Sequence, residues 1–348
     1  MSMFYQKAQD ICKSVLRNKG IKGIAVSLKY KDCEWNYEDG NLSDNRSFFI
    51  ASTTKLFTTA IILKLFHEGR ILLSDKIVNF FPEGQLNGTL LYKGRDYIDE
   101  VTIKQCLMHT SGLPDYFLVK NQEGKTIFDD LVNDKDRSWT FEEIIEYVKT
   151  LSAPFPPGDR KAHYSDTNFT ILGKIIEIIY ALSYEEVVKN EICTPLQLTH
   201  TYVYRDINDK TPVLINYKNK ELIIPQAMSC FGPDGGAVSN ASELNTFLYA
   251  FWNGFFFPKS FNSELKVWNN IFYPLKAGVG LHGFKMPSVF TMFKKTPMFV
   301  GYTGLNGTVA FAVPDEDFYF SGTVNNASQQ QKIFQTCLRI YLSCKKYL

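Results

Sequence analysis

The sequence predicts an α+β fold: an antiparallel sheet flanked by helices, with an inserted, mainly helical lobe. Short runs typical of strands lie in the first 50 and the last hundred residues, whereas residues 70–230 are mostly helical segments joined by loops marked by Gly and Pro. A chain of 348 residues also exceeds what one hydrophobic core usually organises. We therefore expect one lobe from residues 1–68 and 231–348 and a second from 69–230, with the functional site between them.

The N-terminal segment predicts a helix followed by antiparallel strands. Residues 1–19 carry apolar side chains at helical spacing, and Gly20 is placed to end that helix. IAVSLKY and residues 48–50 are typical of strands, and NYEDGN between them has the composition of a turn.

Residues 52–68, STTKLFTTAIILKLFHE, predict a buried helix, because apolar residues cover most of its circumference. Another helix is expected after Ser239. The runs MFVGYTG, TVAFAVP and FYFSGTV predict strands, and a closing helix is expected over about residues 329–342.

Composition narrows the classes of function. With 45% hydrophobic and 21% charged residues, the chain is typical of a globular protein, and a net charge of +2 gives little support for a nucleic-acid partner. The N-terminus lacks the continuous apolar stretch of a signal peptide, and no segment is long enough to span a bilayer. Seven scattered cysteines suit reduced thiols. We expect a cytoplasmic protein without a membrane partner, a metal site or a required cofactor; the oligomeric state stays open.

Ser52 and Lys55 start the buried helix as an S-x-x-K motif. Residues three apart on a helix share a face, so the Lys55 amine can approach the Ser52 hydroxyl. A serine is a weak nucleophile until a neighbouring base takes its proton, and burial can lower the pKa of a lysine enough for that task. By itself this motif is weak, since it occurs by chance in many chains.

A series of further segments makes the motif specific. The sequence resembles the class C β-lactamase, DD-peptidase and esterase family over about residues 22–325, in the family's order. The resemblance rests on FIASTTKLFTTAIILKLFHEGRILLSDKIVNFFP, VTIKQCLMHTSGLPDY, FPPGDRKAHYSDTNFTILGKIIE, TPLQLTHT, GPDGGAVSNASELNTF and VGYTGLNGTVAFAVP. It implies a β-lactamase/DD-peptidase-like fold, with Ser52 as the nucleophile and no cofactor.

The family's second motif falls on Tyr164, Ser165 and Asp166. A phenol beside Ser52 and Lys55 can act as a phenolate base and later as an acid, provided that a nearby cation lowers its pKa. The family usually has Asn where this chain has Asp166. A carboxylate there would pair with Lys55, hold it charged and shift the role of base toward Tyr164, so both candidates for the base stay open.

The third motif falls on Tyr302, Thr303 and Gly304, where the family commonly has Lys or His first. A cation there helps to hold the carboxylate of penicillins and D-Ala-ended peptides, and a tyrosine offers a hydrogen bond without a charge. The resemblance implies substrate-binding roles for Asp166, Tyr302, Thr303 and Gly304. It places the oxyanion hole at the backbone N–H groups of Ser52 and Leu305.

Two histidines could be drawn into a Ser-His-Asp triad. His109 lies in a segment that resembles a structural landmark of the family, so a packing or hydrogen-bonding role is favoured for it. His163 is next to Tyr164, and whether it lines the cleft stays open.

The residues together predict a serine hydrolase that forms an acyl-enzyme on a small ester, peptide or β-lactam carbonyl. Small esters or D-amino-acid peptides are favoured over cell-wall peptides, because an unexported protein would not meet peptidoglycan and Tyr302 supplies no cation. A true β-lactamase stays open. The alternative is a non-hydrolytic penicillin-binding or scaffold relative that keeps the fold, and Asp166 and Tyr302 are the features that support it.

Overall fold

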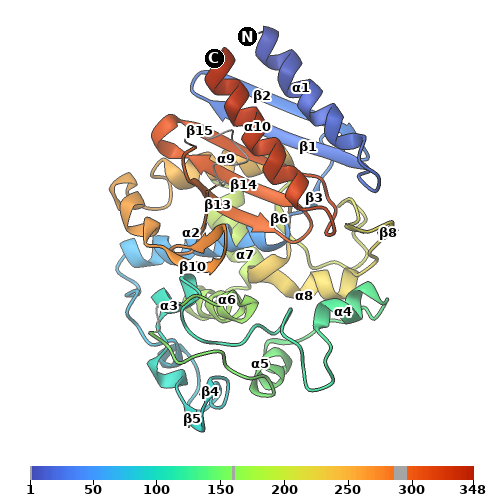
Figure 1. The fold of residues 1–348 in the computed structure, drawn as a ribbon. Coiled ribbons are helices and arrows are strands. Elements are labelled where there is room, and N and C mark those ends of the chain that lie inside the picture. The colour runs from blue at the N-terminus through green and yellow to red at the C-terminus, as the bar shows by residue number, and fades with distance from the viewer. Residues whose placement is uncertain (1, 159–160, 286–295) are drawn as a thin grey trace.

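A computed structural model describes residues 2–158, 161–285 and 296–348 (Figure 1). Its central feature is an antiparallel sheet of eight strands in the order β10-β11-β12-β13-β14-β15-β1-β2. The strands are β1 (Gly23–Tyr30), β2 (Cys33–Gly40), β10 (Asn269–Phe272), β11 (Leu275–Ala277), β12 (His282–Phe284), β13 (Phe299–Gly304), β14 (Thr308–Val313) and β15 (Phe318–Thr323). The predicted α+β fold with an antiparallel sheet is confirmed.

The sheet joins the two ends of the chain. Strand β15 pairs with β1 in a register that runs from Ala25 opposite Thr323 to Tyr30 opposite Phe318. Strands β14 and β15 are buried along their whole length, whereas β2 at the sheet edge alternates between buried and exposed positions. This pattern follows from burial on two faces in the centre of the sheet and on one face at its edge.

The prediction of a turn at NYEDGN is wrong, because these residues lie largely within β2. The hairpin turns instead at Lys31 and Asp32, and Tyr30 pairs with Cys33. The strand is stabilised by Trp35 and Tyr37, whose rings stack with centroids 5.9 Å apart and pack against the N-terminal helix side of the sheet. Side-chain packing therefore outweighs local turn composition.

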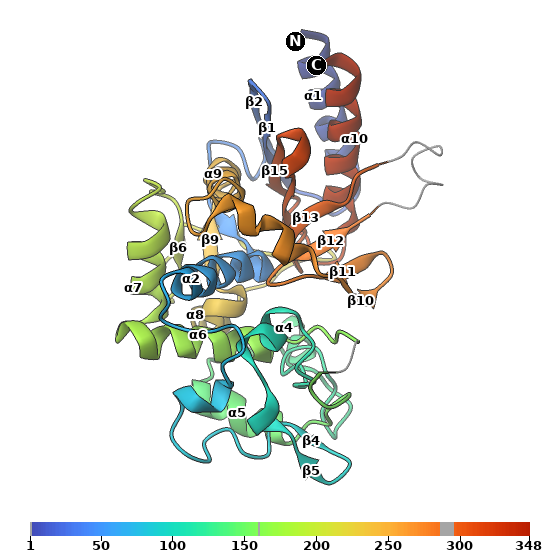
Figure 2. The same ribbon diagram turned by 90° about the vertical axis from the view of Figure 1, so that its left-hand side faces the viewer.

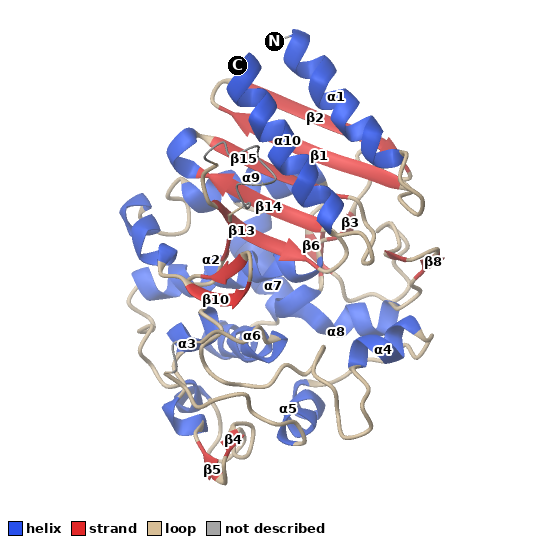
Figure 3. Cartoon of the chain, in the orientation of Figure 1, coloured by secondary structure: helices blue, strands red, loops and turns tan. Residues whose placement is uncertain are grey.

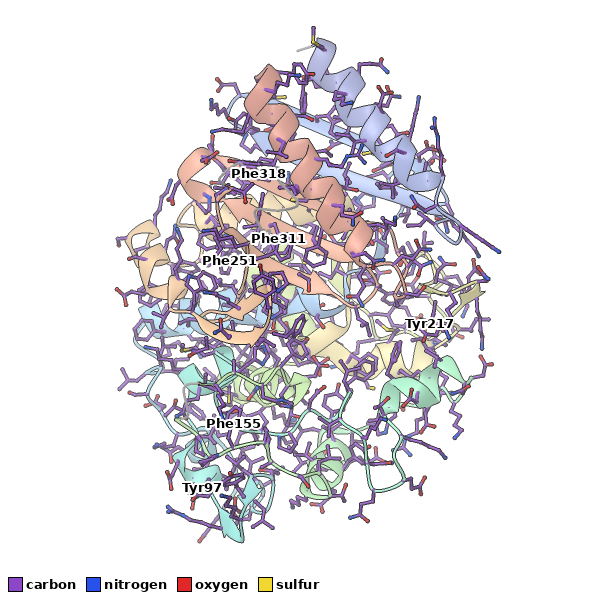
Figure 4. All side chains as sticks on the ribbon, viewed as in Figure 1. Tyr97, Phe155, Tyr217, Phe251, Phe311 and Phe318 are labelled. Carbon is purple, nitrogen blue, oxygen red and sulfur yellow. The ribbon has the colours of Figure 1, made fainter. Side chains whose placement is uncertain are left out.

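Helices cover both faces of the sheet (Figures 1 and 2). Helices α1 (Ser2–Leu16) and α10 (Gln331–Tyr347) pack side by side on one face, and α9 (Ala241–Trp252) packs on the other face against β1 and β15. Figure 4 labels Phe311 and Phe318, which belong to the core under α1 and α10, and Phe251, which belongs to the core on the opposite face.

Residues 69–230 form mainly short helices and loops away from the sheet (Figure 3). The helices are α3 (Ile103–Leu107), α4 (Ile127–Val132), α5 (Phe141–Lys149), α6 (Asp166–Tyr180), α7 (Tyr184–Val188) and α8 (Pro225–Gly235). Two hairpins, β4 (Leu91–Tyr92) with β5 (Arg95–Asp96) and β7 (Asn216–Tyr217) with β8 (Lys220–Glu221), project from the loops. A small sheet joins β3 (Phe48–Phe49), β9 (Ala237–Ser239) and β6 (Tyr202–Val203).

Helix α2 (Lys55–His67) lies between the sheet and this helical part and is almost completely buried, as its apolar circumference predicts. A continuous apolar cluster runs from the inner face of the sheet through α2 into α6. The two expected lobes therefore share a core, and their boundaries at residues 68 and 230 stay a prediction. Among the helices of the described ranges, none combines the length and apolar composition needed to cross a membrane.

Candidate active site

Ser52 lies on a short 3-10 turn, Ala51–Thr54, directly before α2 rather than on the α-helix itself. The turn begins at Ala51, which has a φ of 46° in the left-handed region that costs a residue with a Cβ about 1–2 kcal/mol. The Thr54 hydroxyl donates to the Ala51 carbonyl at 2.7 Å and accepts from the Ala237 N–H at 3.1 Å. These bonds hold the Ser52 turn between α2 and β9.

Lys55 is completely buried and is committed to two partners other than Ser52. Its Nζ donates to Asp166 Oδ1 at 2.5 Å and to the backbone carbonyl of Asp234. Among the described contacts, none joins Lys55 Nζ to Ser52 Oγ. A buried ammonium group needs such a carboxylate and further acceptors, because removing one partner leaves an uncompensated charge.

Tyr164 connects Ser52 with Asp166. Its hydroxyl oxygen lies 2.8 Å from Ser52 Oγ and 2.9 Å from Asp166 Oδ1. Burial and, after it, the Asp166 carboxylate hold the pKa of Tyr164 well above its usual range. The Lys55 Nζ lies 5.2 Å from the centre of the Tyr164 ring, but it does not reverse this shift. A free phenolate at Tyr164, which the sequence suggested, is therefore disfavoured.

Two further acids, which the sequence analysis missed, stand behind Asp166. Asp115 Oδ1 accepts the backbone N–H of Asp166 at 2.8 Å. Asp234 Oδ2 accepts the hydroxyls of Tyr116 and Thr170, each at 2.7 Å. Burial and the Asp166 charge raise the pKa of both carboxyls, to about 8 for Asp115 and about 7 for Asp234. Their place beside Gly and Pro in the GLPDY and GPDGG segments was an available signal.

Tyr302 points into the protein. It is completely buried, its hydroxyl lies 2.8 Å from His109 Nε2, and its ring stacks on His282 with centroids 3.9 Å apart. The Ser165 N–H and the Asn168 side-chain amide both face His109 Nδ1. These donors require Nδ1 to be the acceptor, so Nε2 carries the proton and donates to Tyr302.

His109 thus has the packing and hydrogen-bonding role that the sequence favours. Burial keeps the pKa of His109 well below its usual range, and the nearby His282 lowers it further.

The strand that follows Tyr302 approaches the serine turn closely. A Cβ at Gly304 would lie 2.6 Å from the carbonyl oxygen of Ile50 and 3.1 Å from the Cβ of Ala51. The glycine is therefore needed for β13 to pass this turn. Thr303 is half-buried opposite Val309, and no described contact links it to Ser52.

A pocket of about 70 Å³ opens beside Ser52. The polar residues that line it are Ser52, Tyr116, Asp166, Asp234 and Asn306, and Leu305 also borders it. The other walls are mostly apolar and include Phe117, Phe128, Leu131, Ile215, Leu222, Ile224, Met228 and Phe231. Among the described residues that line it there is no Lys, Arg or His.

The backbone N–H groups of Ser52 and Leu305 make no backbone hydrogen bond within the described ranges. Both residues border the pocket, as an oxyanion hole at these positions requires.

The structure thus brings together Ser52, Lys55, Tyr164 and Asp166 in one hydrogen-bonded group. Gly304 lies beside the serine turn and Leu305 borders the pocket, whereas Tyr302 and Thr303 are not among the described residues that line the pocket. His163 is half-buried, and its backbone N–H donates to the backbone carbonyl of His109 at 2.9 Å. It is not among the residues that line the described pocket.

This fold, with a serine turn before a buried helix, is that of the serine β-lactamase and penicillin-binding protein superfamily. The chain belongs to the Beta-lactamase family, whose model matches residues 9–332. Beta-lactamase-like protein 2 of Dictyostelium discoideum is 28% identical over 266 residues, which are 71% of this chain and 45% of that protein. This chain therefore spans less than half the length of that curated relative.

Two solved structures share the fold. The D-amino acid amidase from Ochrobactrum anthropi SV3, complexed with D-phenylalanine, has a TM-score of 0.80 at 18% identity and covers 99% of each chain. The D-stereospecific amidohydrolase from Streptomyces sp. has a TM-score of 0.76 at 24% identity, over 95% of this chain and 97% of the other.

Proposed function

We propose that this protein is a serine hydrolase that cleaves small esters or amides whose acyl group is apolar and carries no negative charge. The observation that carries this proposal is the place of Ser52 among the few polar residues that line a pocket with mostly apolar walls. A few polar groups in a mostly apolar pocket are typical of sites for small molecules.

The reaction is a two-step acyl transfer. Ser52 Oγ attacks the carbonyl, and the backbone N–H groups of Ser52 and Leu305 bind the oxyanion. Such donors typically contribute about 3–4 kcal/mol to the transition state. The leaving group departs with a proton, and water then hydrolyses the acyl-enzyme.

The charges beside the pocket argue against an anionic acyl group. Asp166 and Asp234 line the pocket, and the buried Lys55 is already paired with Asp166. An anionic substrate would bring a further negative charge beside these acids without a free cation to bind it. An ammonium group on the substrate would suit the same acids. The structural relatives named as a D-amino acid amidase and a D-stereospecific amidohydrolase support the choice of amino-acid amides as test substrates.

A matched pair of esters tests the expectation that a negatively charged acyl group is disfavoured, which we call the charge rule. p-Nitrophenyl butyrate and p-nitrophenyl hemisuccinate have acyl chains of the same length, and the second carries a carboxylate. We expect kcat/KM for the butyrate to exceed that for the hemisuccinate by about a hundredfold, because an unpaired buried charge costs several kcal/mol. Equal values for the two esters would contradict the charge rule. D- and L-phenylalanine amide, measured alongside, test the amide.

The Ser52→Ala variant separates hydrolysis from the alternative. Loss of ester turnover in this variant, with an unchanged melting temperature, supports Ser52 as the nucleophile. A stable penicilloyl adduct on the wild type without turnover of any ester or amide, seen by intact-protein mass, would instead favour a non-hydrolytic penicillin-binding relative.

A further inference from the structure

We propose that Asp166 is the terminal proton acceptor of the reaction, reached from Ser52 through the hydroxyl of Tyr164. The inference rests on the proposed hydrolase function and assigns Asp166 a part in the chemistry rather than in substrate binding alone. Lys55, in this arrangement, holds Asp166 in place and does not take the serine proton.

The number of hydroxyl protons sets the direction of transfer. The Tyr164 oxygen is within hydrogen-bond distance of both Ser52 Oγ, at 2.8 Å, and Asp166 Oδ1, at 2.9 Å. A phenol carries one proton, and a carboxylate in an ion pair only accepts. The Tyr164 hydroxyl donates to Ser52 Oγ, and the same hydroxyl can turn to donate to Asp166 Oδ1. Once it donates to Asp166, its oxygen can accept the proton of the Ser52 hydroxyl, so the turn of one O–H bond opens the path from Ser52 to Asp166.

Tyr164 passes the proton on and is not its final acceptor. Burial and the Asp166 carboxylate raise the pKa of its phenol well above the usual range, so a lasting phenolate is unfavourable. A phenol that receives a proton from Ser52 must release its own at the same time. Asp166 Oδ1 is the acceptor within reach, and the Asp115 carboxylate fixes the backbone N–H of the same residue at 2.8 Å.

The ammonium group of Lys55 is bonded to acceptors other than the serine. Its Nζ is bonded to Asp166 Oδ1 and to the Asp234 carbonyl, and no bond to Ser52 Oγ occurs in the described part of the chain. To act as the base it would have to lose a proton while buried against a carboxylate, which would leave that carboxylate unpaired. Its position suits a clamp on Asp166.

The proton transfers balance in both steps. In acylation the Ser52 O–H bond breaks as an O–H bond forms on Tyr164, the Tyr164 O–H bond breaks as one forms on Asp166, and the serine oxygen bonds to the carbonyl carbon. The proton returns by the same path to the leaving group as the bond between that group and the carbonyl carbon breaks. In deacylation the oxygen of a water molecule bonds to the carbonyl carbon and its proton follows the path to Asp166. The proton then returns to Ser52 Oγ as the bond between Oγ and the carbonyl carbon breaks.

A set of variants tests the relay with p-nitrophenyl butyrate. The side chain in Asp166→Asn can accept the Tyr164 hydrogen bond but cannot take its proton. We expect kcat/KM to fall by about 10²–10⁴-fold, as for loss of a general base. If Lys55 were the base, the same change would remove its ion-pair partner and leave kcat/KM unchanged or higher, which would overturn the relay.

A solvent-isotope measurement distinguishes the relay from a merely structural role. In mixtures of H₂O and D₂O, two protons moving together give a bowed dependence of kcat/KM on the deuterium fraction for the wild type and a linear one for Asp166→Asn. Asp129→Asn, which changes an acid of α4 outside the relay and the pocket lining, is the control and should keep the bowed curve. A linear curve for the wild type would contradict the relay.

The double variant Tyr164→Phe/Asp166→Asn completes the test, because residues that act as one unit are not additive. We expect its kcat/KM to be within about threefold of the slower single variant. Fully additive losses would overturn the relay while leaving the hydrolase function standing. Absence of wild-type turnover, or turnover that persists in Ser52→Ala, would instead overturn the proposed function and the relay with it.

Discussion

The Tyr302 hydroxyl and His109 Nε2 are 2.8 Å apart, and both side chains are buried. The first residue of the third motif is thus bonded to the segment that follows α3 and does not line the pocket beside Ser52. This contact connects β13 to the segment that carries Tyr164, since the Ser165 N–H is also bonded to His109.

Tyr302→Phe should affect folding more than turnover. The change leaves the buried His109 Nε2–H without its acceptor, so we expect the free energy of unfolding to fall by about 1–3 kcal/mol. kcat/KM for p-nitrophenyl butyrate should change by less than about threefold, because the hydroxyl does not border the pocket. Urea unfolding and ester kinetics measure both effects. A hundredfold loss of kcat at unchanged stability would show that Tyr302 takes part in the chemistry.

Gly304→Ala should displace the serine turn. The added Cβ would approach the Ile50 carbonyl to 2.6 Å, so either β13 or the turn must shift. A displacement of about 1 Å can cost about 10²-fold in rate, and we expect kcat to fall by that amount. Gly124→Ala is the comparison: its φ of 77° is also strained for alanine, but nothing lies within 4 Å of the new Cβ. That variant should lose stability without losing kcat.

Phe128→Ala should widen the range of acyl groups. Phe128 borders the pocket from α4 and is half-buried, so its removal enlarges the apolar wall at a limited cost in stability. We expect the ratio of kcat/KM for p-nitrophenyl octanoate over butyrate to rise by about tenfold, since each buried methylene contributes about 0.8 kcal/mol. Phe141→Ala, a half-buried residue that stacks on Phe81, should leave this ratio unchanged.

The buried acids predict how stability depends on pH. The pKa of Asp115 is raised to about 8 and that of Asp234 to about 7, so the native state keeps protons that the unfolded chain has released. The free energy of unfolding therefore decreases as pH rises from about 4 to 8. Urea unfolding measures the decrease in the free energy of unfolding between pH 5 and pH 8. We expect this decrease to be about 1–3 kcal/mol smaller for Asp115→Asn than for the wild type.

The half-buried Asp129 serves as the control of opposite sign. The N–H and hydroxyl of Thr126 lower its pKa, so its contribution is present at neutral pH and is lost on acidification. Asp129→Asn should not reduce the loss of stability between pH 5 and 8. Parallel curves for the wild type and Asp115→Asn would contradict the assignment of a raised pKa to Asp115.

The sequence predicts the parts of this molecule that depend on local pattern. The apolar circumference of residues 52–68 identified a buried helix, and the strand-like composition of the C-terminal runs identified the strands β13, β14 and β15. Strand β2 was missed because its turn-like composition is overridden by Trp35 and Tyr37, which pack across the sheet. Strands β10, β11 and β12 are three or four residues long, too short for a clear pattern.

The active site shows the same division between features set by local sequence and features set by tertiary contacts. Ser52, Lys55, Tyr164 and Asp166 could be named from motifs, and the structure places them in one hydrogen-bonded group. The predicted pairing of Lys55 with Asp166 is confirmed, but its second partner, the backbone carbonyl of Asp234, could not be derived because it lies far along the chain. A backbone acceptor has no signature in the side-chain sequence. The inward direction of Tyr302 likewise depends on His109, which is brought near only by the tertiary fold.

The two bonds of Lys55 have a consequence beyond the reaction. Its ammonium group joins the start of α2, the start of α6 and the end of α8, three segments that are distant in the sequence. One side chain thus acts as a non-covalent cross-link in the centre of the molecule. A substitution at position 55 would remove this cross-link as well as alter the active site. Stability and hydrolytic activity are therefore coupled at this position.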